Sequence, residues 1–266
     1  MRRRSDAIAP RALPRGLPDL LWQIGLFLAA FLLYDLVRGV VNNGGAYTPF
    51  GNATKIINAE RSLHIFAEPS VQGWALNKHW LMDIADWTYL NGHFLLTLAT
   101  LAFVYFRRNR SFYFIRNMFL VSMAIALLGY GLFPTAPPRL MHEWGFTDSI
   151  SQFVVGGTGS IDLGPSSTFM NWYAAVPSMH VCFATMLAGS MIRLVRRRTA
   201  KVAWALYPGL VTFVVVVTAN HYFTDVFLGA LTAGASALLA KRLLARARPG
   251  VWAFGAAGGD LTPTPA

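Results

Sequence analysis

The chain has few charged residues and almost no cysteine. Only 13% of its 266 residues are Asp, Glu, Lys or Arg, about half the share of roughly 25% that soluble domains contain. Hydrophobic residues make up 55%. The single cysteine, Cys182, excludes an intramolecular disulfide and is expected to be a small buried residue. The composition therefore indicates a membrane protein rather than a soluble domain.

Acidic residues are scarce as well, and their shortage gives the chain a formal charge of +11. A charge of this size is also found in nucleic-acid-binding proteins. Here, however, the basic residues fall in short runs between apolar segments, without the interleaved aromatic residues of a soluble nucleic-acid-binding face. We therefore expect no nucleic-acid partner, and we expect the runs to set membrane topology and to contact anionic headgroups.

Six apolar segments are long enough to cross a bilayer core, which needs about 20 helical residues. They are 20–41, 85–106, 112–133, 173–192, 202–219 and 223–240. We predict an all-α, polytopic membrane protein whose six transmembrane helices form a bundle. The predicted parts are an N-terminal tail (1–19), the first span with an outer segment (20–84), a catalytic core (85–245) and a disordered tail (246–266).

The distribution of Lys and Arg predicts the orientation of these spans. Segments on one side of the predicted membrane hold 18 of the 23 basic residues, and the other side holds 5. Because basic loops stay in the cytoplasm, we expect both termini inside and an extracytoplasmic active face, in a plasma (inner) membrane. The outer segments are then about 42–84, about 134–172 and the turn near Asn220.

Two helix faces have a structural interpretation. In the first outer segment, an interfacial helix would carry an apolar face with Ile56, Ile57, Leu63 and Phe66, opposite Lys55, Glu60 and Arg61. In the last span, small residues recur at four-residue spacing, which allows helix backbones to approach closely. These small residues are Gly229, Ala230, Ala233 and Gly234.

Three polar clusters lie at the predicted outer ends of spans. The first, 133–140, is rich in proline and contains Arg139, whose guanidinium can hold a phosphate through two parallel hydrogen bonds. The second, 175–180, contains Ser178 and His180 at a helix start, where backbone N–H groups bind anions. The third, 220–225, contains His221 and Asp225 at the spacing of one helix face.

Each cluster also has a purely structural interpretation. Arg139 could extend to the headgroups, His180 could hydrogen-bond a neighbouring helix, and His221 with Asp225 could be a structural pair. The distribution of Lys and Arg, which is independent of these motifs, puts all three clusters on the same side of the membrane. We therefore favour a joint site in which a carboxylate fixes the tautomer of a nucleophilic histidine.

At these residues the sequence resembles the type 2 phosphatidic acid phosphatase superfamily, whose soluble relatives include vanadate haloperoxidases and acid phosphatases. It looks most similar to the inositol phosphorylceramide synthases, which are inositol phosphotransferases. The resemblance covers about 85–245. It rests on Gly129-Tyr130 with 133–140, on 177–180, and on His221-Tyr222 with Asp225 and Gly229.

The resemblance implies a role for each site residue and requires neither metal nor cofactor. His221 would attack phosphorus and form a phosphohistidine, Asp225 would orient it, and His180 would protonate the leaving alcohol. Phosphate would be bound by Arg139 and Ser178, and the pocket would be lined by His93, Asn220 and Tyr130. Nucleophilic catalysis with a positioned acid and a fixed positive charge fits these residue types.

The sequence departs from the phosphatase members of the superfamily at two positions. Leu132 stands where they have a lysine seven residues before the motif arginine, and Val215 stands where they have an arginine six residues before the nucleophile. The phosphate site is thus less cationic, which favours the inositol phosphotransferase branch.

The expected function is cleavage or transfer of a lipid phosphoester or phosphodiester. Water as acceptor gives a phosphatase, and a polyol, sugar or lipid alcohol gives a transferase. One alternative is a polyprenyl diphosphate phosphatase, and a non-enzymatic alternative is a transporter or structural membrane protein. Gly156-Gly157-Thr158-Gly159 lacks the ending of a nucleotide-binding loop, so we expect a flexible loop over the site.

Overall fold

The computed structural model describes residues 13–41, 47–155 and 175–256. Every regular element within these ranges is a helix, which confirms the all-α fold class. The segment Gly156-Gly157-Thr158-Gly159, expected to form a loop over the site, lies outside the described residues, as do the first residues of the predicted span 173–192.

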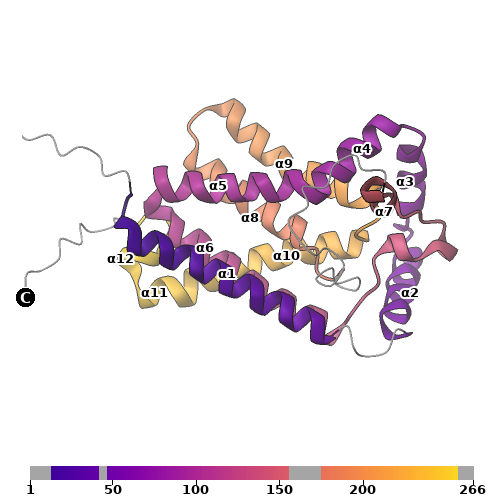
Figure 1. Ribbon diagram of the computed structural model, residues 1–266, viewed down its shortest axis with the longest axis horizontal. Helices are drawn as coiled ribbons and strands as arrows, with labels where there is room; N and C mark the ends of the chain where they lie inside the picture. Colours follow the sequence, from indigo (N-terminus) through magenta and orange to yellow (C-terminus); the bar gives the residue numbers. More distant parts are fainter. Residues whose placement is uncertain (1–12, 42–46, 156–174, 257–266) are drawn as a thin grey trace, which may run out of the picture.

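The longer helices lie beside one another along the long axis of the molecule (Figure 1). They are α1 (Gly16–Val41), α5 (His93–Arg107), α6 (Asn109–Leu132), α8 (Met179–Leu194), α9 (Arg198–Val217) and α10 (Phe223–Leu239). Helix α8 packs against α9 and α10, and α6 packs against α1 and α10. The polar clusters at the starts of α8 and α10 are therefore carried by neighbouring helices.

Shorter helices gather at the two ends of this bundle (Figure 1). At one end lie α2 (Tyr47–Ser62), α3 (Glu68–Leu76), α4 (His79–Trp87) and α7 (Ser149–Val155). At the other end lie α11 (Ala245–Ala247) and α12 (Pro249–Trp252). A π-helical turn, Thr88–Gly92, joins α4 to α5 in one continuous helix.

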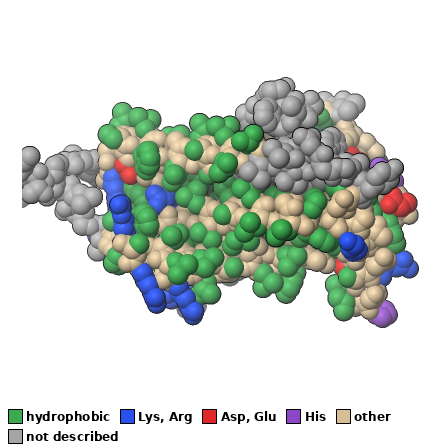
Figure 2. Space-filling view, turned by 90° about the horizontal axis from the view of Figure 1, so that it is seen from below, with side chains coloured by type: hydrophobic (Ala, Val, Ile, Leu, Met, Phe, Trp, Pro, Cys, Tyr) green, Lys and Arg blue, Asp and Glu red, His purple; other side chains and the backbone are tan. Residues whose placement is uncertain are grey.

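Five helices in the described residues are long and apolar enough to cross a membrane. Their spans are Gly16–Leu33, His79–Arg107, Asn109–Leu132, Arg198–Val217 and Phe223–Ala247. Hydrophobic side chains cover much of the flank of the bundle in Figure 2, as expected for a surface that faces lipid. These helices indicate an integral membrane protein.

The fourth predicted span, 173–192, is shorter than expected. It corresponds to α8, which has 16 residues and therefore a length of about 24 Å at about 1.5 Å per residue. A bilayer core is about 30 Å thick. The preceding Ser178 is fully buried, so α8 begins inside the protein rather than at its surface. The count of six spans stays a prediction.

The basic segments meet at one end of the bundle, where Figure 2 shows Lys and Arg side chains gathered. The Arg15 guanidinium lies 4.1 Å from the centre of the Tyr113 ring, and the Gly255 N–H donates to Ser111 Oγ over 3.1 Å. A pocket of about 460 Å³ at this end is lined by residues from four parts of the chain, including Pro14, Arg107, Leu194 and Gly255. This grouping matches the division of charges read from the sequence.

The predicted disordered tail, 246–266, is ordered in its first half. Helix α12 is followed by Phe254, whose ring packs on the Phe114 ring of α6 at a centroid distance of 5.6 Å. Trp252 lies 5.6 Å below the Arg116 guanidinium. The prediction of disorder was wrong for 246–256 because these aromatic side chains, in a segment otherwise rich in Gly, have a helix surface to bury against.

Two expectations about helix faces were also partly wrong. In α2, Ile56 and Ile57 are buried as expected, but Glu60 is fully buried too. Its carboxylate accepts a hydrogen bond from the start of α10, which is why it points inward. Leu63, expected on the apolar face, is 68% exposed.

In α10, the small residues divide between packing and exposure. A Cβ atom on Gly229 would lie 2.4 Å from the Ser178 carbonyl oxygen, so Gly229 permits the close approach of α10 to the start of α8. Ala233 is buried, which also fits the prediction of close packing. Ala230 and Gly234 are exposed instead, and a Cβ on Gly234 would meet open space.

Candidate active site

The three polar clusters read from the sequence meet in space. The backbone N–H of Arg139 donates to the carbonyl of Ala219, the residue before the third cluster, over 2.7 Å, and Arg139 Nη1 donates to Asn220 Oδ1 within that cluster. The Ser178 N–H donates to the Asp225 carbonyl over 3.1 Å, which joins the second to the third. The ring centroids of His180 and His221 are 5.8 Å apart. Residues from α8, α10 and the segment after α6 thus form one site.

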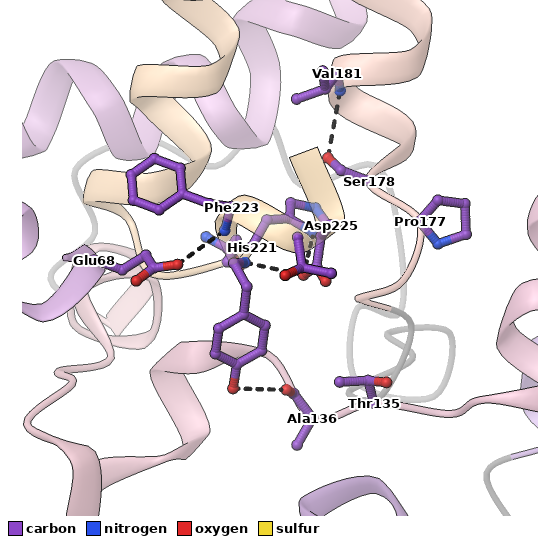
Figure 3. Close-up of polar contacts among 12 residues, drawn as sticks. Glu68, Thr135, Ala136, Pro177, Ser178, Val181, His221, Phe223 and Asp225 are labelled. Carbon is purple, nitrogen blue, oxygen red and sulfur yellow. Dashed lines mark hydrogen bonds and ion pairs between the residues drawn. The ribbon is translucent and has the colours of Figure 1, made fainter. Parts of the chain in front are cut away.

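His221 and Asp225 are in contact, although not for the reason that the spacing suggested. His221 lies before α10 rather than on it, and Asp225 is in the first turn of that helix. The Asp225 Oδ2 atom lies 3.4 Å from His221 Nδ1 and accepts the Tyr222 N–H over 3.0 Å. Figure 3 shows His221 and Asp225 at the start of the helix. Capping of the helix therefore brings the carboxylate to the imidazole.

Burial sets the protonation state of His221. The side chain is only 4% exposed, and burial lowers the pKa of its imidazole to about 3. The Ala175 carbonyl opposes this shift through a hydrogen bond, and the positive charge of Arg139 adds to it. A neutral imidazole keeps the lone pair that nucleophilic attack requires, so burial is compatible with the role predicted for His221 from the sequence.

Arg139 is held beside this histidine by the residue before it. Its Nη1 atom donates to Asn220 Oδ1. Asn220 is anchored in turn, because its Nδ2 donates to the carbonyl and the Oγ1 of Thr218 over 3.1 and 2.9 Å. On its other side, Arg139 Nε lies 3.8 Å from Asp148 Oδ1. The guanidinium is thus buried, oriented and partly balanced by one carboxylate.

Ser178 and His180 stand at the start of α8. Ser178 is the N-cap residue, and its Oγ accepts the Val181 N–H over 3.4 Å (Figure 3). His180 is in the first turn, and its ring stacks on Tyr89 with centroids 4.5 Å apart. Tyr130 donates to the Pro177 carbonyl over 3.2 Å, so it holds the segment before Ser178.

His93 extends the site away from His221. Its ring centroid lies 5.2 Å from that of His180, and its Nδ1 lies 2.7 Å from Tyr207 Oη. Both His93 and Tyr89 belong to the continuous helix with the π-helical turn Thr88–Gly92. Such turns are frequent at functional sites, because the extra residue redirects neighbouring side chains.

The two departures from the phosphatase pattern have clear structural positions. Leu132 is 83% exposed at the end of α6. Val215 is fully buried in the core of the bundle, and its carbonyl accepts the N–H groups of Asn220 and His221 over 2.9 and 3.2 Å. Arg139 is the cation that the described site retains from the three in the phosphatase pattern.

Sequence reasoning missed several groups that contact the site residues. Asp148 and Tyr207 lie in no motif, and only the fold brings them close. Glu60 and Glu68 were also missed, although both are fully buried against the start of α10. A buried acidic residue gives no periodic signal when its partner is a backbone N–H more than 150 residues away.

One of three comparisons with known proteins identifies a family. A family model described as the PAP2 superfamily matches residues 54–239, a stretch that includes all the site residues named above. Searches of curated proteins and of solved structures gave no match. Among the described residues, no group of three or more His, Cys, Asp or Glu side chains is arranged to hold a metal ion. Because the family match covers more than half of the sequence, the chain belongs to the PAP2 superfamily, whose members are phosphatases.

Proposed function

We propose that the protein is a membrane-embedded lipid phosphatase or phosphotransferase that acts through a phosphohistidine intermediate. One observation carries the proposal: a buried His221 contacts Asp225, faces His180 and lies beside the guanidinium held by Asn220. Nucleophile, orienting carboxylate, proton donor and fixed cation are the four groups that a covalent phosphoryl transfer needs.

In the first half-reaction, His221 attacks phosphorus while the bond from phosphorus to the lipid oxygen breaks. A proton from His180 goes to that oxygen, so the lipid leaves as a neutral alcohol. Arg139 balances the charge on the phosphoryl oxygens. A positive charge develops on the His221 ring during the attack, and an unpaired charge is costly there because the ring is buried. Asp225 stabilises that charge.

The second half-reaction reverses these steps with another alcohol or with water. The acceptor gives its proton to His180, its oxygen attacks phosphorus, and the bond to His221 breaks. The acceptor decides the outcome: water gives phosphatase activity, and a polyol, sugar or lipid alcohol gives transfer.

The charge of the site supports an inositol-phosphotransferase-like activity. A single guanidinium, partly balanced by Asp148 at 3.8 Å, suits the one negative charge of a phosphodiester better than the two of a phosphomonoester. A polyprenyl diphosphate carries still more negative charge. We therefore favour a diester phospholipid as donor over a prenyl diphosphate.

We further propose that the chain crosses the membrane six times, with α8 as a short crossing in addition to the five longer ones, and that both termini lie in the cytoplasm. The gathering of basic segments at one end of the bundle supports this orientation. The site would then face the extracytoplasmic side of a plasma (inner) membrane. The lipid would enter sideways between helices.

The test uses full-length protein purified in detergent with EDTA present. Phosphatidylinositol, phosphatidic acid and a prenyl diphosphate are offered separately, with and without an added alcohol such as glycerol or inositol. Wild type is compared with His221→Ala and with His79→Ala, a control at an exposed histidine on α4.

We expect cleavage of phosphatidylinositol by wild type and His79→Ala, increased by the alcohol and absent in His221→Ala. Activity that survives in His221→Ala would overturn the proposed mechanism. Release of phosphate from the prenyl diphosphate alone, without any acceptor, would favour the polyprenyl diphosphate phosphatase instead.

A further inference from the structure

Two buried carboxylates from the outer segment reach the start of α10. Glu68, the first residue of α3, accepts the Phe223 N–H at Oε1 over 2.9 Å. Glu60 of α2 accepts the Thr224 N–H over 2.7 Å and the Thr224 hydroxyl over 2.7 Å. Both glutamates are fully buried. Figure 3 shows the Glu68 carboxylate directed at the Phe223 backbone.

Together with Asp225, the glutamates form a continuous cap. The N–H groups of Tyr222, Phe223 and Thr224 are consecutive, and each is accepted by a different carboxylate. The first N–H groups of a helix have no partner within the helix, so they must be satisfied by other groups. Negative charge at this position also interacts favourably with the helix dipole.

Because Glu60 and Glu68 accept two of these N–H groups, Asp225 can stay close to His221. If Glu60 and Glu68 were absent, two buried N–H groups next to Asp225 would lack acceptors. Acidic side chains near a helix start readily turn to such N–H groups. Asp225 Oδ2 would then be drawn from its position 3.4 Å from His221 Nδ1.

The two glutamates lie beside one another in the buried cap. Burial raises the pKa of Glu68 to about 8, and the neighbouring Glu60 carboxyl group raises it as well. A proton on Glu68 removes the repulsion that two buried charges side by side would cause. Both side chains can therefore accept from the start of α10 at neutral pH.

We propose that Glu60 and Glu68 are positioning residues that cap α10 and thereby keep Asp225 on His221. The inference rests on the function proposed above, in which Asp225 orients the nucleophile. It assigns a role to the outer segment before the catalytic core, a part of the chain that no motif singled out.

The experiment compares alanine and glutamine variants at both positions, in full-length protein in detergent. A glutamine oxygen can accept the same N–H, and its amide can donate to the remaining carboxylate, so glutamine keeps the cap without adding a negative charge. Gln23→Ala serves as the control, because Gln23 is a buried polar residue with hydrogen bonds to Asp19 and Arg116 at the basic end.

Two measurements are independent of the lipid substrate. Orthovanadate, which adopts the geometry of phosphoryl transfer, reports the affinity of the phosphate site, and hydrogen–deuterium exchange of the peptide 218–228 reports the cap. We expect Glu60→Ala and Glu68→Ala to bind vanadate about tenfold more weakly, because Asp225 would no longer support His221, and the loss of one such charged contact has an effect of this size. Their N–H groups at Phe223 and Thr224 should exchange faster. Glu60→Gln, Glu68→Gln and Gln23→Ala should bind vanadate like wild type.

Unchanged exchange in the alanine variants would overturn the capping role. Faster exchange with unchanged vanadate affinity would overturn the positioning role. Glutamine variants that bind vanadate as weakly as the alanine variants would overturn it too. If His221→Ala binds vanadate as tightly as wild type, the proposed function fails. The hydrogen–deuterium exchange measurement would still decide whether Glu60 and Glu68 cap α10.

Discussion

Arg139 donates through Nη1 to the side-chain oxygen of Asn220, the residue directly before His221. The proposed phosphate-binding cation and the proposed nucleophile are therefore held by adjacent residues of one turn. Both N–H groups of that turn, at Asn220 and His221, donate to the Val215 carbonyl. A displacement of this turn would move cation and nucleophile together.

Replacing Asn220 by alanine should weaken phosphate binding. The change removes the acceptor of the Arg139 guanidinium, a charged hydrogen bond worth about 1.5–3 kcal/mol. We expect vanadate affinity to fall about tenfold or more. Thr218→Val is the milder control, because Asn220 keeps its bond to the Thr218 carbonyl. Wild-type affinity in Asn220→Ala would show that Arg139 needs no such support.

Replacing Gly229 by alanine should disrupt the packing of α10 on α8. The new Cβ would lie 2.4 Å from the Ser178 carbonyl oxygen, and overpacking of this kind costs about 1–3 kcal/mol. We expect a lower unfolding midpoint and loss of activity. Gly234→Ala, on the same helix in open space, should leave both unchanged or raise the midpoint slightly. Equal behaviour of the two variants would contradict the observed contact.

The pH dependence of activity should show no titration of the nucleophile His221 near the usual histidine pKa. Burial lowers the pKa of His221 to about 3, so the free enzyme keeps a neutral nucleophile well below pH 6.5. A pH profile of kcat/KM should show no loss from His221 protonation between pH 7 and pH 5. A loss of kcat/KM centred near pH 6.5, still present after each of the other histidines is replaced in turn, would contradict the assigned surroundings of His221.

The same shift predicts how stability depends on pH. The folded pKa is lower than the unfolded pKa of about 6.5, so the unfolded state binds more protons and stability falls with decreasing pH. His221 contributes full stability above pH 6.5 and loses about 1.4 kcal/mol per pH unit below it, until the folded pKa is reached. Relative to His221→Gln, wild type should therefore unfold more readily at pH 5 than at pH 7.5. Parallel curves for the two proteins would contradict this.

Replacing Asp148 by asparagine should shift substrate preference toward more highly charged phosphates. Asp148 lies 3.8 Å from Arg139 and also caps α7 through the N–H and hydroxyl groups of Ser151. Asparagine can keep the contact with the Ser151 N–H but removes the negative charge. We expect cleavage of phosphatidic acid to rise relative to phosphatidylinositol by several-fold. An unchanged ratio would refute the proposed basis for diester preference.

Much of the helical framework could be predicted from the sequence, because long apolar runs and basic segments report directly on bilayer crossing. The contact between His221 and Asp225 was also predictable from their spacing, although capping rather than a shared helix face produces it. The length of α8 was less accessible, because apolar composition does not reveal that Ser178 lies inside the protein.

The supporting groups could not be predicted, because their partners are backbone atoms or distant rings. Glu60 read as a residue of a solvated helix face, yet it binds the Thr224 N–H. Trp252 and Phe254 read as part of a disordered tail, yet α6 and its neighbours offer them a surface. Such contacts depend on the three-dimensional packing of helices, which local patterns do not encode.

The most direct test of the account is to trap the covalent intermediate. Wild type and His221→Ala are mixed with phosphatidylinositol in EDTA, quenched in alkali, where phosphohistidine is stable, and digested for mass analysis. We predict one added phosphoinositol group on the wild-type peptide that contains His221, and none in the variant. Wild-type protein that cleaves the lipid yet carries no group on His221, or carries it elsewhere, would contradict the central claim.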